Sequence, residues 1–220
     1  METARRVDQR FFADLEDVLI WAVELGVSPG SRFHIYRNTI EWLLKHDNEE
    51  DLARIYAQLI AEDRITEILS TMVDSIELVE TISVLRQNGV NVPPTLLKKA
   101  FSGPADVFRE DETSNHARNA MFELSMGAMA ARQGLRPVLS TGNPDVSFQF
   151  EGRSVKMECK RVLSENKIIE RLKEGVKQLG KSVQTGSSDI GLVAISLSKL
   201  LNRMDLHRTL PSPSRIRSIA

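Results

Sequence analysis

The sequence predicts a two-part α+β chain, with an N-terminal all-helical region followed by an α/β unit. In the first half, apolar residues recur every three or four positions, as they do in amphipathic helices. Further along, short segments alternate apolar and polar residues, as half-buried strands do, with helical segments on either side. The formal charge changes sign at the same place. Residues 1–112 carry 12 Lys and Arg against 21 Asp and Glu (net −9), whereas residues 113–220 carry 17 against 9 (net +8).

Residues 1–112 are expected to form a succession of helices. FFADLEDVLIWAVELG, which begins at Phe11, has an apolar stripe that includes Leu15 and Val18, and the following GVSPGS interrupts the period. The period resumes in residues 32–46 and 51–87, and Pro93-Pro94 precedes a last short helix. This region is a candidate for partner binding, dimerisation or target selection, and its composition does not choose among these roles.

Residues 113–200 are expected to form the α/β unit, in the order helix, three strands, helix, strand. The first helix has Ser114 as its expected N-cap and ends at Gly134. The strands and the second helix are then expected over 135–141, 144–150, 153–162, 166–183 (the helix) and 189–198. Residues 201–220 contain proline, serine and arginine without an apolar period, which predicts a disordered tail.

Composition excludes several classes of protein. The chain has 220 residues, 41% hydrophobic and 27% charged, which is typical of a soluble globular protein with a real core. No apolar run reaches the roughly 18 residues that span a bilayer, and the N-terminus lacks the apolar segment of a signal peptide. The single cysteine, Cys159, excludes a disulfide framework and a cysteine-cluster zinc site. We therefore expect a cytoplasmic protein without a membrane partner.

The segment PDVSFQFEGRSVKMECK predicts a β-hairpin with an unusual charge arrangement. With Glu151-Gly152 as a two-residue turn, Val146 faces Met157 on an apolar surface. Asp145 then lies directly opposite Glu158, where like charges destabilise a strand pair. Lys160 is two residues beyond Glu158 and lies on the same face, while the Cys159 side chain points to the other face, toward the core.

Two interpretations of these opposed carboxylates remain open. A divalent cation between them would turn the repulsion into a binding site, and oxygen ligands without cysteine favour Mg²⁺ or Mn²⁺ over zinc. Alternatively, the strands lie at the surface and Lys156 and Lys160 neutralise the acidic side chains.

Pro144-Asp145, followed after twelve residues by Glu158-Cys159-Lys160, resembles the motif of the PD-(D/E)xK (restriction-endonuclease-like) nuclease superfamily. That family's core has the order of elements expected here from about residue 114 to residue 198. The resemblance implies catalytic roles for Asp145, Glu158 and Lys160, with Glu123 on the preceding helix as a fourth member. It further implies that the metal binds Asp145, Glu158, the backbone carbonyl of Cys159 and Glu123. Gln178 on the second helix is a possible accessory residue.

The implied function is metal-dependent hydrolysis of phosphodiester bonds in nucleic acid, DNA rather than RNA. Basic residues around the motif are expected to contact the phosphates: Arg118, Lys156, Arg161, Lys173, Lys177 and Lys181. Two alternatives stay open: a non-cleaving nucleic-acid-binding or regulatory module of the same fold, and a helical interaction protein. Endonuclease or exonuclease action, specificity and oligomeric state are not readable from the sequence.

Overall fold

The N-terminal half of the computed structural model is helical. The structure describes residues 2–28, 30–45, 49–62, 64–105, 115–183, 189–198 and 200. The helices of this half are α1 (Glu2–Glu24), α2 (Ser31–Lys45), α3 (Glu49–Ala61), α4 (Ile65–Gln87) and α5 (Pro94–Ala100). The helical period expected over 51–87 is thus divided between α3 and α4. Within the described residues, no helix has the length and apolar character needed to cross a membrane.

The C-terminal half contains the expected helix, strands, helix and strand in the expected order. Its elements are α6 (His116–Arg132), β1 (Val138–Leu139), β2 (Val146–Phe150), β3 (Arg153–Arg161), a 3₁₀ turn (Glu165–Lys167), α7 (Ile168–Ser182) and β4 (Ile190–Ser196). β1 is shorter than the strand expected over 135–141. Asn115 is the N-cap of α6, whereas Ser114 and the tail 201–220 lie outside the described residues. The two-part α+β fold class is confirmed.

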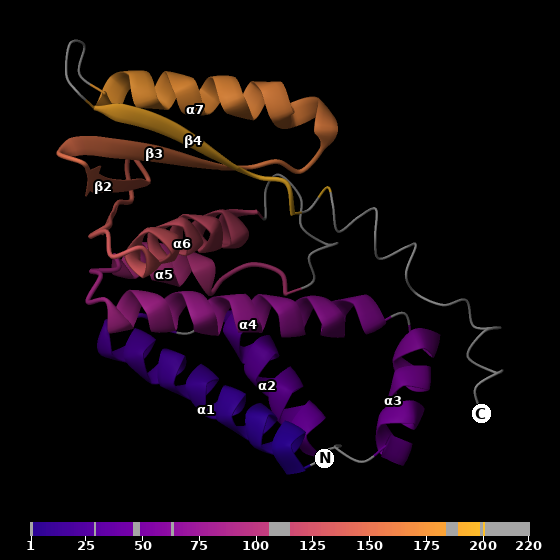
Figure 1. Ribbon diagram of the computed structural model, residues 1–220. Coiled ribbons are helices and arrows are strands. Elements are labelled where there is room, and N and C mark those ends of the chain that lie inside the picture. The colour runs from indigo at the N-terminus through magenta and orange to yellow at the C-terminus, as the bar shows by residue number, and fades with distance from the viewer. Residues whose placement is uncertain are drawn as a thin grey trace.

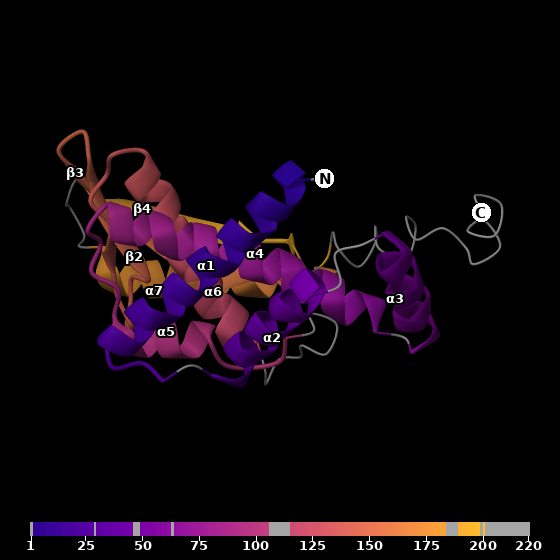
Figure 2. The same ribbon diagram turned by 90° about the horizontal axis from the view of Figure 1, so that it is seen from below.

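The four strands form one mixed sheet with the order β1-β2-β3-β4. β1, β2 and β3 are antiparallel neighbours, and α7 is the crossover that makes β4 parallel to β3. α6 contacts the first three strands, while α7 contacts β3 and β4 from the opposite face (Figure 1). The view from below places α3 away from the sheet, at the far end of the helical half (Figure 2).

The predicted hairpin register is confirmed. Val146 pairs with Met157 and Phe148 pairs with Val155. Glu151 (φ 49°) and Gly152 (φ 75°) both have positive φ, as a two-residue type I′ turn requires. Val146 is fully buried, so this face of the hairpin is the core face. Asp145, which immediately precedes β2, is thereby directed toward Glu158.

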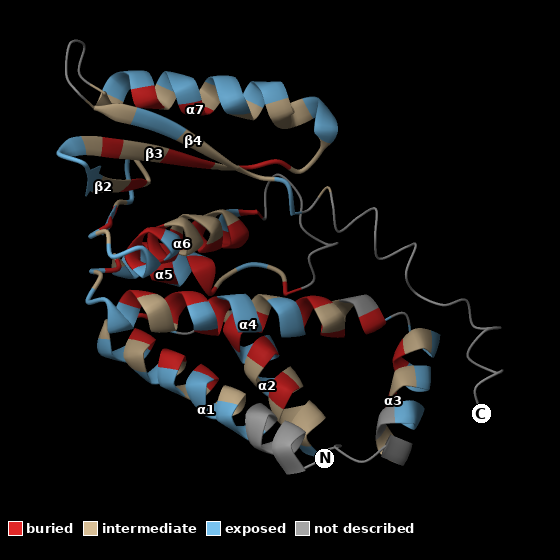
Figure 3. Ribbon diagram, viewed as in Figure 1, coloured by how far each residue is buried: buried red, intermediate tan, exposed pale blue. Residues whose placement is uncertain are grey.

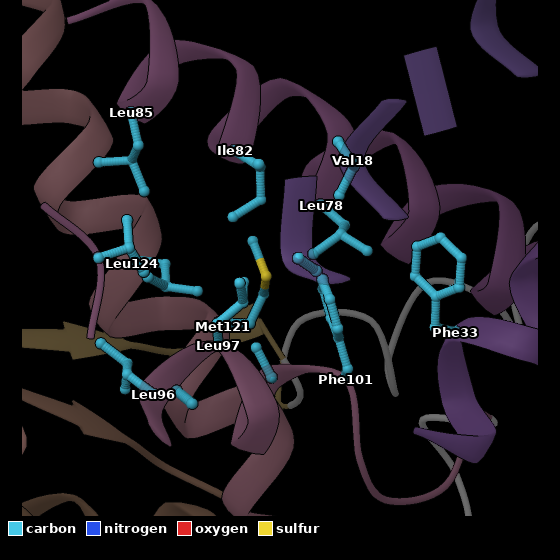
Figure 4. Close-up of a cluster of buried hydrophobic side chains, with 14 of the residues drawn as sticks. Val18, Phe33, Leu78, Ile82, Leu85, Leu96, Leu97, Phe101, Met121 and Leu124 are labelled. Atoms are coloured by element: carbon cyan, nitrogen blue, oxygen red, sulfur yellow. The ribbon is translucent and has the colours of Figure 1, made fainter. Parts of the chain in front are cut away.

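One hydrophobic core connects the two halves of the chain. Figure 4 shows Val18 of α1, Phe33 of α2, Ile82 of α4 and Leu124 of α6 among side chains that point toward one another. The same cluster continues through strand residues such as Val146. Figure 3 shows this burial along the facing sides of α4, α5 and α6. The boundary expected near residue 112 lies outside the described residues, but the core crosses from one half to the other.

Two glycines allow the helices to approach the sheet closely. A Cβ atom on Gly127 of α6 would lie 2.7 Å from Cδ2 of Leu139, and one on Gly175 of α7 would lie 2.8 Å from Cγ1 of Val193. Neither contact is possible without movement, because packed carbon atoms are separated by about 3.5–4.0 Å. α6 and α7 therefore hold the sheet between them at short range.

Candidate active site

The structure brings together the three motif residues predicted from the hairpin. Asp145 Oδ2 accepts a hydrogen bond from the backbone N–H of Cys159 at 2.7 Å, which fixes the carboxylate against β3. Lys160 Nζ lies 3.1 Å from Glu158 Oε2 and 4.0 Å from Asp145 Oδ2. The three side chains come from the start of β2 and the end of β3. The arrangement is therefore a product of the strand register.

Glu158 is the most buried member of this group. Its relative exposure is 0%, and its Oε1 atom has no hydrogen-bond partner in the described structure. Burial raises the pKa of Glu158, the neighbouring Asp145 charge raises it further, and Lys160 opposes both effects. A buried carboxylate oxygen without a partner is costly unless a cation or donor reaches it. Within the described residues, Glu158 Oε1 is therefore a buried acceptor without a donor.

Glu123 of α6 lies within electrostatic range of the same group. Burial and then the charge of Asp145 raise the pKa of Glu123 to about 7, while Lys99 and Lys160 lower it. Among the described residues, no three His, Cys, Asp or Glu side chains form a group that could hold a metal ion by themselves. The metal-binding roles of Asp145, Glu158 and Glu123 therefore stay predictions.

Cys159 is a core residue, as predicted. Its side chain is buried in the shared core, and burial raises the pKa of the thiol far above its usual range. A thiol that stays protonated in an apolar environment is not a nucleophile. The metal-binding role implied for its backbone carbonyl stays a prediction.

Two side-chain amides and one lysine belong to the surroundings of the site. Gln178 Oε1 and Asn119 Oδ1 are both buried without a hydrogen-bond partner in the described structure. Asn119 lies one turn before Glu123 on α6. Gln178 lies one turn after Gly175, whose Cβ position is 3.6 Å from Cγ of Lys160. Lys99, at the end of α5, was not predicted, since no local pattern in the sequence connects α5 with Glu123.

Arg118 and Arg161, both expected to contact nucleic acid, have buried side chains, which does not favour those contacts. Arg118 Nε donates to Asp74 Oδ2 at 3.1 Å, and its Nη2 donates to the carbonyl of Ala105 at 2.7 Å. The physical reason is the position of α6, which lies between the helical half and the sheet and has no broad solvent face.

Lys156 also has a structural role. Its Nζ lies 2.8 Å from Asp189 Oδ2 and donates to the carbonyl of Ser182. These contacts tie β3 to the end of α7 and to the residue before β4, so the expected phosphate contact of Lys156 is replaced by an internal ion pair. By contrast, Lys173, Lys177 and Lys181 are exposed along α7.

The helical half has a cavity of its own, which the sequence did not predict. It has a volume of about 500 Å³ and lies between α2, α3 and α4. Trp42, Arg54, Ile55, Gln58 and Arg64 are among its lining residues. None of the carboxylates of the candidate site contributes to it.

Comparison of the chain with protein-family models, with curated proteins and with solved structures finds no match. The likeness to PD-(D/E)xK nucleases therefore stays a resemblance, based on the motif and on the order of the elements.

Proposed function

We propose that the protein hydrolyses phosphodiester bonds of nucleic acid, preferentially DNA, in a metal-dependent reaction at a PD-(D/E)xK-type site. One observation carries the proposal: Asp145 and Glu158 meet at the end of the β2–β3 pair beside Lys160, with one Glu158 oxygen buried and unpartnered. A purely structural ion pair needs one acidic and one basic side chain, whereas two carboxylates lie beside one lysine here.

The donor set fits a hard divalent cation. Asp145 and Glu158 offer carboxylate oxygens. Glu123 offers a further carboxylate within electrostatic range of Asp145, and the backbone carbonyl of Cys159 follows Glu158 directly in the chain. Mg²⁺ and Mn²⁺ prefer such ligands, whereas zinc prefers nitrogen and sulfur. When bound, the cation would supply Lewis-acid stabilisation of the phosphate and promote ionisation of water. Lys160, at 3.1 Å from Glu158, is held beside the same position.

The residues of the chain then have distinct tasks. Asp145 and Glu158 would hold the cation, while Lys160 orients the attacking water and compensates charge on the phosphate. The water oxygen forms a bond to phosphorus and the ester P–O bond breaks. The water releases one proton to solvent, and the leaving alkoxide takes one up. Burial of Glu158 keeps its carboxylate fixed, so that no reorganisation is needed during the reaction.

Electrostatic attraction provides substrate binding. Lys99 contributes positive charge at the Glu123 side of the site, and exposed lysines of α7 extend it. Phosphate contacts of this kind release counterions, so binding should weaken steeply as salt rises.

The activity test uses the full chain with Mg²⁺ or Mn²⁺ on plasmid DNA, DNA oligonucleotides and RNA. Lys160→Met should reduce cleavage by about 10²–10³-fold, the usual loss when one charge-stabilising donor is removed, with substrate binding retained. Lys45→Met, an exposed lysine at the end of α2 in the helical half, is the matched control and should cleave normally. Equal cleavage by Lys160→Met would exclude Lys160 from the reaction.

A second measurement separates binding from cleavage. Calorimetry should show Mn²⁺ binding to the wild type and not to Asp145→Asn, with the exposed Glu165→Gln as the control. If the wild type binds Mn²⁺ and nucleic acid but cleaves no substrate, the non-cleaving module replaces the nuclease. If it binds no metal, the proposed metal-dependent site is wrong.

A further inference from the structure

The cavity between α2, α3 and α4 is a feature of the helical half that the proposed nuclease activity does not use. Its volume of about 500 Å³ lies within the range of about 300–1,000 Å³ that small-molecule pockets have. α3 lies away from the sheet (Figure 2), and none of the carboxylates of the candidate site lines the cavity. Any group bound here therefore lies outside the candidate site.

One part of the cavity lining is apolar. Ile55, Leu59 and Ile68 belong to a second cluster of buried aliphatic residues, and Trp42 packs against this cluster. An indole beside aliphatic side chains favours a planar ring, because aromatic rings stack on one another in offset geometry. Insertion of such a ring also removes apolar surface of both partners from water. The apolar part of the lining therefore favours an aromatic ligand.

Two amide side chains, Asn38 of α2 and Gln58 of α3, line the same cavity. Gln58 Nε2 donates to Glu62 Oε1 at 2.7 Å, which leaves the side-chain carbonyl of Gln58 as an acceptor. No hydrogen bond joins the Asn38 amide to another residue that the structure describes. An amide presents a donor and an acceptor side by side, and Asn and Gln recognise the edges of bases in this way. The polar part of the lining therefore favours a ring with hydrogen-bonding groups on its edge.

The charged side chains at the rim of the cavity are matched within the protein. Arg54 Nη2 lies 2.7 Å from Asp51 Oδ1. Arg64 lies 3.5 Å from Glu62 Oε2 through Nη1 and 3.9 Å from Glu67 Oε2 through Nε. A charged ligand would have to displace one of these pairs, and the net charge of −9 on residues 1–112 would also repel an anion. The rim therefore favours an uncharged ligand.

We propose that this cavity binds a nucleobase, an uncharged planar ring that stacks beside Trp42 and exchanges hydrogen bonds with Asn38 and Gln58. Stacking on an aromatic side chain accepts any base, because every base has a π face, and the two amides add a preference among bases. A free nucleoside and a base of a single strand share this chemistry. The acidic helical half favours the free nucleoside, which carries no phosphate.

Tryptophan fluorescence tests the proposal on the full chain. The variant Trp21→Phe keeps Trp42 as its only tryptophan, and a chelator prevents metal-dependent cleavage. Titration of this protein with the four common nucleosides should show saturable quenching by at least one of them. Asn38→Leu and Gln58→Leu should each weaken that binding by about three- to tenfold, because each removes a hydrogen bond to the base. Gln87→Leu is the matched control, because Gln87 is exposed at the end of α4 and does not line the cavity.

Two results would overturn the proposal: no saturable quenching by any nucleoside or oligonucleotide, or unchanged affinity in both amide variants. Comparison with nucleoside 5′-monophosphates and short single-stranded oligonucleotides, at low and high salt, identifies the source of the base. Nucleoside binding should not depend on salt, and the monophosphate should bind less tightly. Tighter binding of the monophosphate would overturn the assignment of an uncharged ligand. Binding of oligonucleotides alone, weakened in both amide variants, would show that the base comes from a strand.

The proposal is independent of the nuclease activity. Lys160→Met in the Trp21→Phe background should bind nucleosides as its parent does, because Lys160 does not line the cavity. A failure of cleavage and a failure of nucleoside binding are therefore observed separately.

Discussion

Two groups of buried charges have opposite composition. In the first, between α2, α4 and α6, Arg32 and Arg118 both pair with Asp74. In the second, at the end of the β2–β3 pair, carboxylates gather around Lys160. The first group has more cations than anions, and the second has more anions than cations, although both lie in the interior of the same chain.

The difference separates a structural tie from a binding site. Asp74 Oδ2 accepts hydrogen bonds from Arg32 Nη2 at 2.8 Å and from Tyr36 Oη at 2.9 Å, in addition to those from Arg118. Its charge is therefore fully used within the protein. In the second group an oxygen of Glu158 has no partner, and the pKa values of Glu158 and Glu123 are raised. This uncompensated negative charge is the observation that supports the proposed cation site.

Breaking the first group should have the largest effect. Asp74→Ala leaves two buried guanidinium groups without their carboxylate and should lower the free energy of unfolding by about 3–5 kcal/mol. Urea unfolding of the full chain at pH 7 measures this. Glu41→Ala, which breaks only solvent-exposed pairs with Arg37 and Lys45, should leave the free energy of unfolding nearly unchanged. A loss for Asp74→Ala as small as that for Glu41→Ala would show that this group is not a tie.

The second group should make the stability of the metal-free protein depend on pH. The folded protein binds the Glu123 proton more tightly than the unfolded chain does, because the pKa is raised from 4.5 to about 7. The folded state therefore holds more protons in this window, and stability of the metal-free protein falls as pH rises through it. The contribution of Glu123 is at most about 3 kcal/mol.

The variant Glu123→Gln isolates the contribution of Glu123 to this pH dependence. In the presence of a chelator, the wild type should lose more stability between pH 4.5 and pH 7 than this variant does. Identical slopes in urea unfolding would mean that Glu123 is solvated and lies outside the group.

Asp145→Asn should not destabilise the metal-free protein, in contrast to Asp74→Ala. It relieves repulsion with Glu158, and the amide oxygen can still accept from the Cys159 N–H. We expect the metal-free stability to stay the same or to rise by up to about 1 kcal/mol. Thermal unfolding with Mn²⁺ should show a raised Tm for the wild type only. If the variant is destabilised like an Asp74 variant, Asp145 is structural.

The smallest effect concerns the hairpin turn that brings the carboxylates together. Glu151 has a φ of 49°, which asparagine tolerates better than glutamate. Glu151→Asn should therefore stabilise the protein by about 0.5 kcal/mol and leave metal binding unchanged. Urea unfolding and calorimetry measure the two quantities. A change in Mn²⁺ affinity would show that the turn and the site are coupled.

The sequence predicts the second group well and the first not at all. The hairpin is local: a two-residue turn and a strict alternation determine which residues face each other, so Asp145 and Glu158 could be paired from the letters alone. The contact between Arg118 and Asp74 joins residues 44 positions apart. The segment STMVDSIELV contains two acidic residues, Asp74 and Glu77, and nothing in it singles out Asp74.

Arg118 was expected to contact phosphates as one of the basic residues around the motif. α6 instead has buried residues around most of its circumference, including Ala117, Arg118 and Met121. Lys99 was missed for a similar reason, since packing of α5 against α6 follows from the shared core and not from a local pattern. Contacts that depend on how the two halves pack are therefore the part that one sequence does not supply.

α6 has a mechanical consequence for the site. Arg118 anchors one turn of this helix to the helical half, and Glu123 is five residues further along, about 7.5 Å at the rise of an α-helix. A hydrogen-bonded helix behaves as a stiff rod over such a length. Any ligand or partner that displaces α4 relative to the sheet therefore displaces Glu123 as well. The helical half is thus mechanically coupled to the carboxylates through α6.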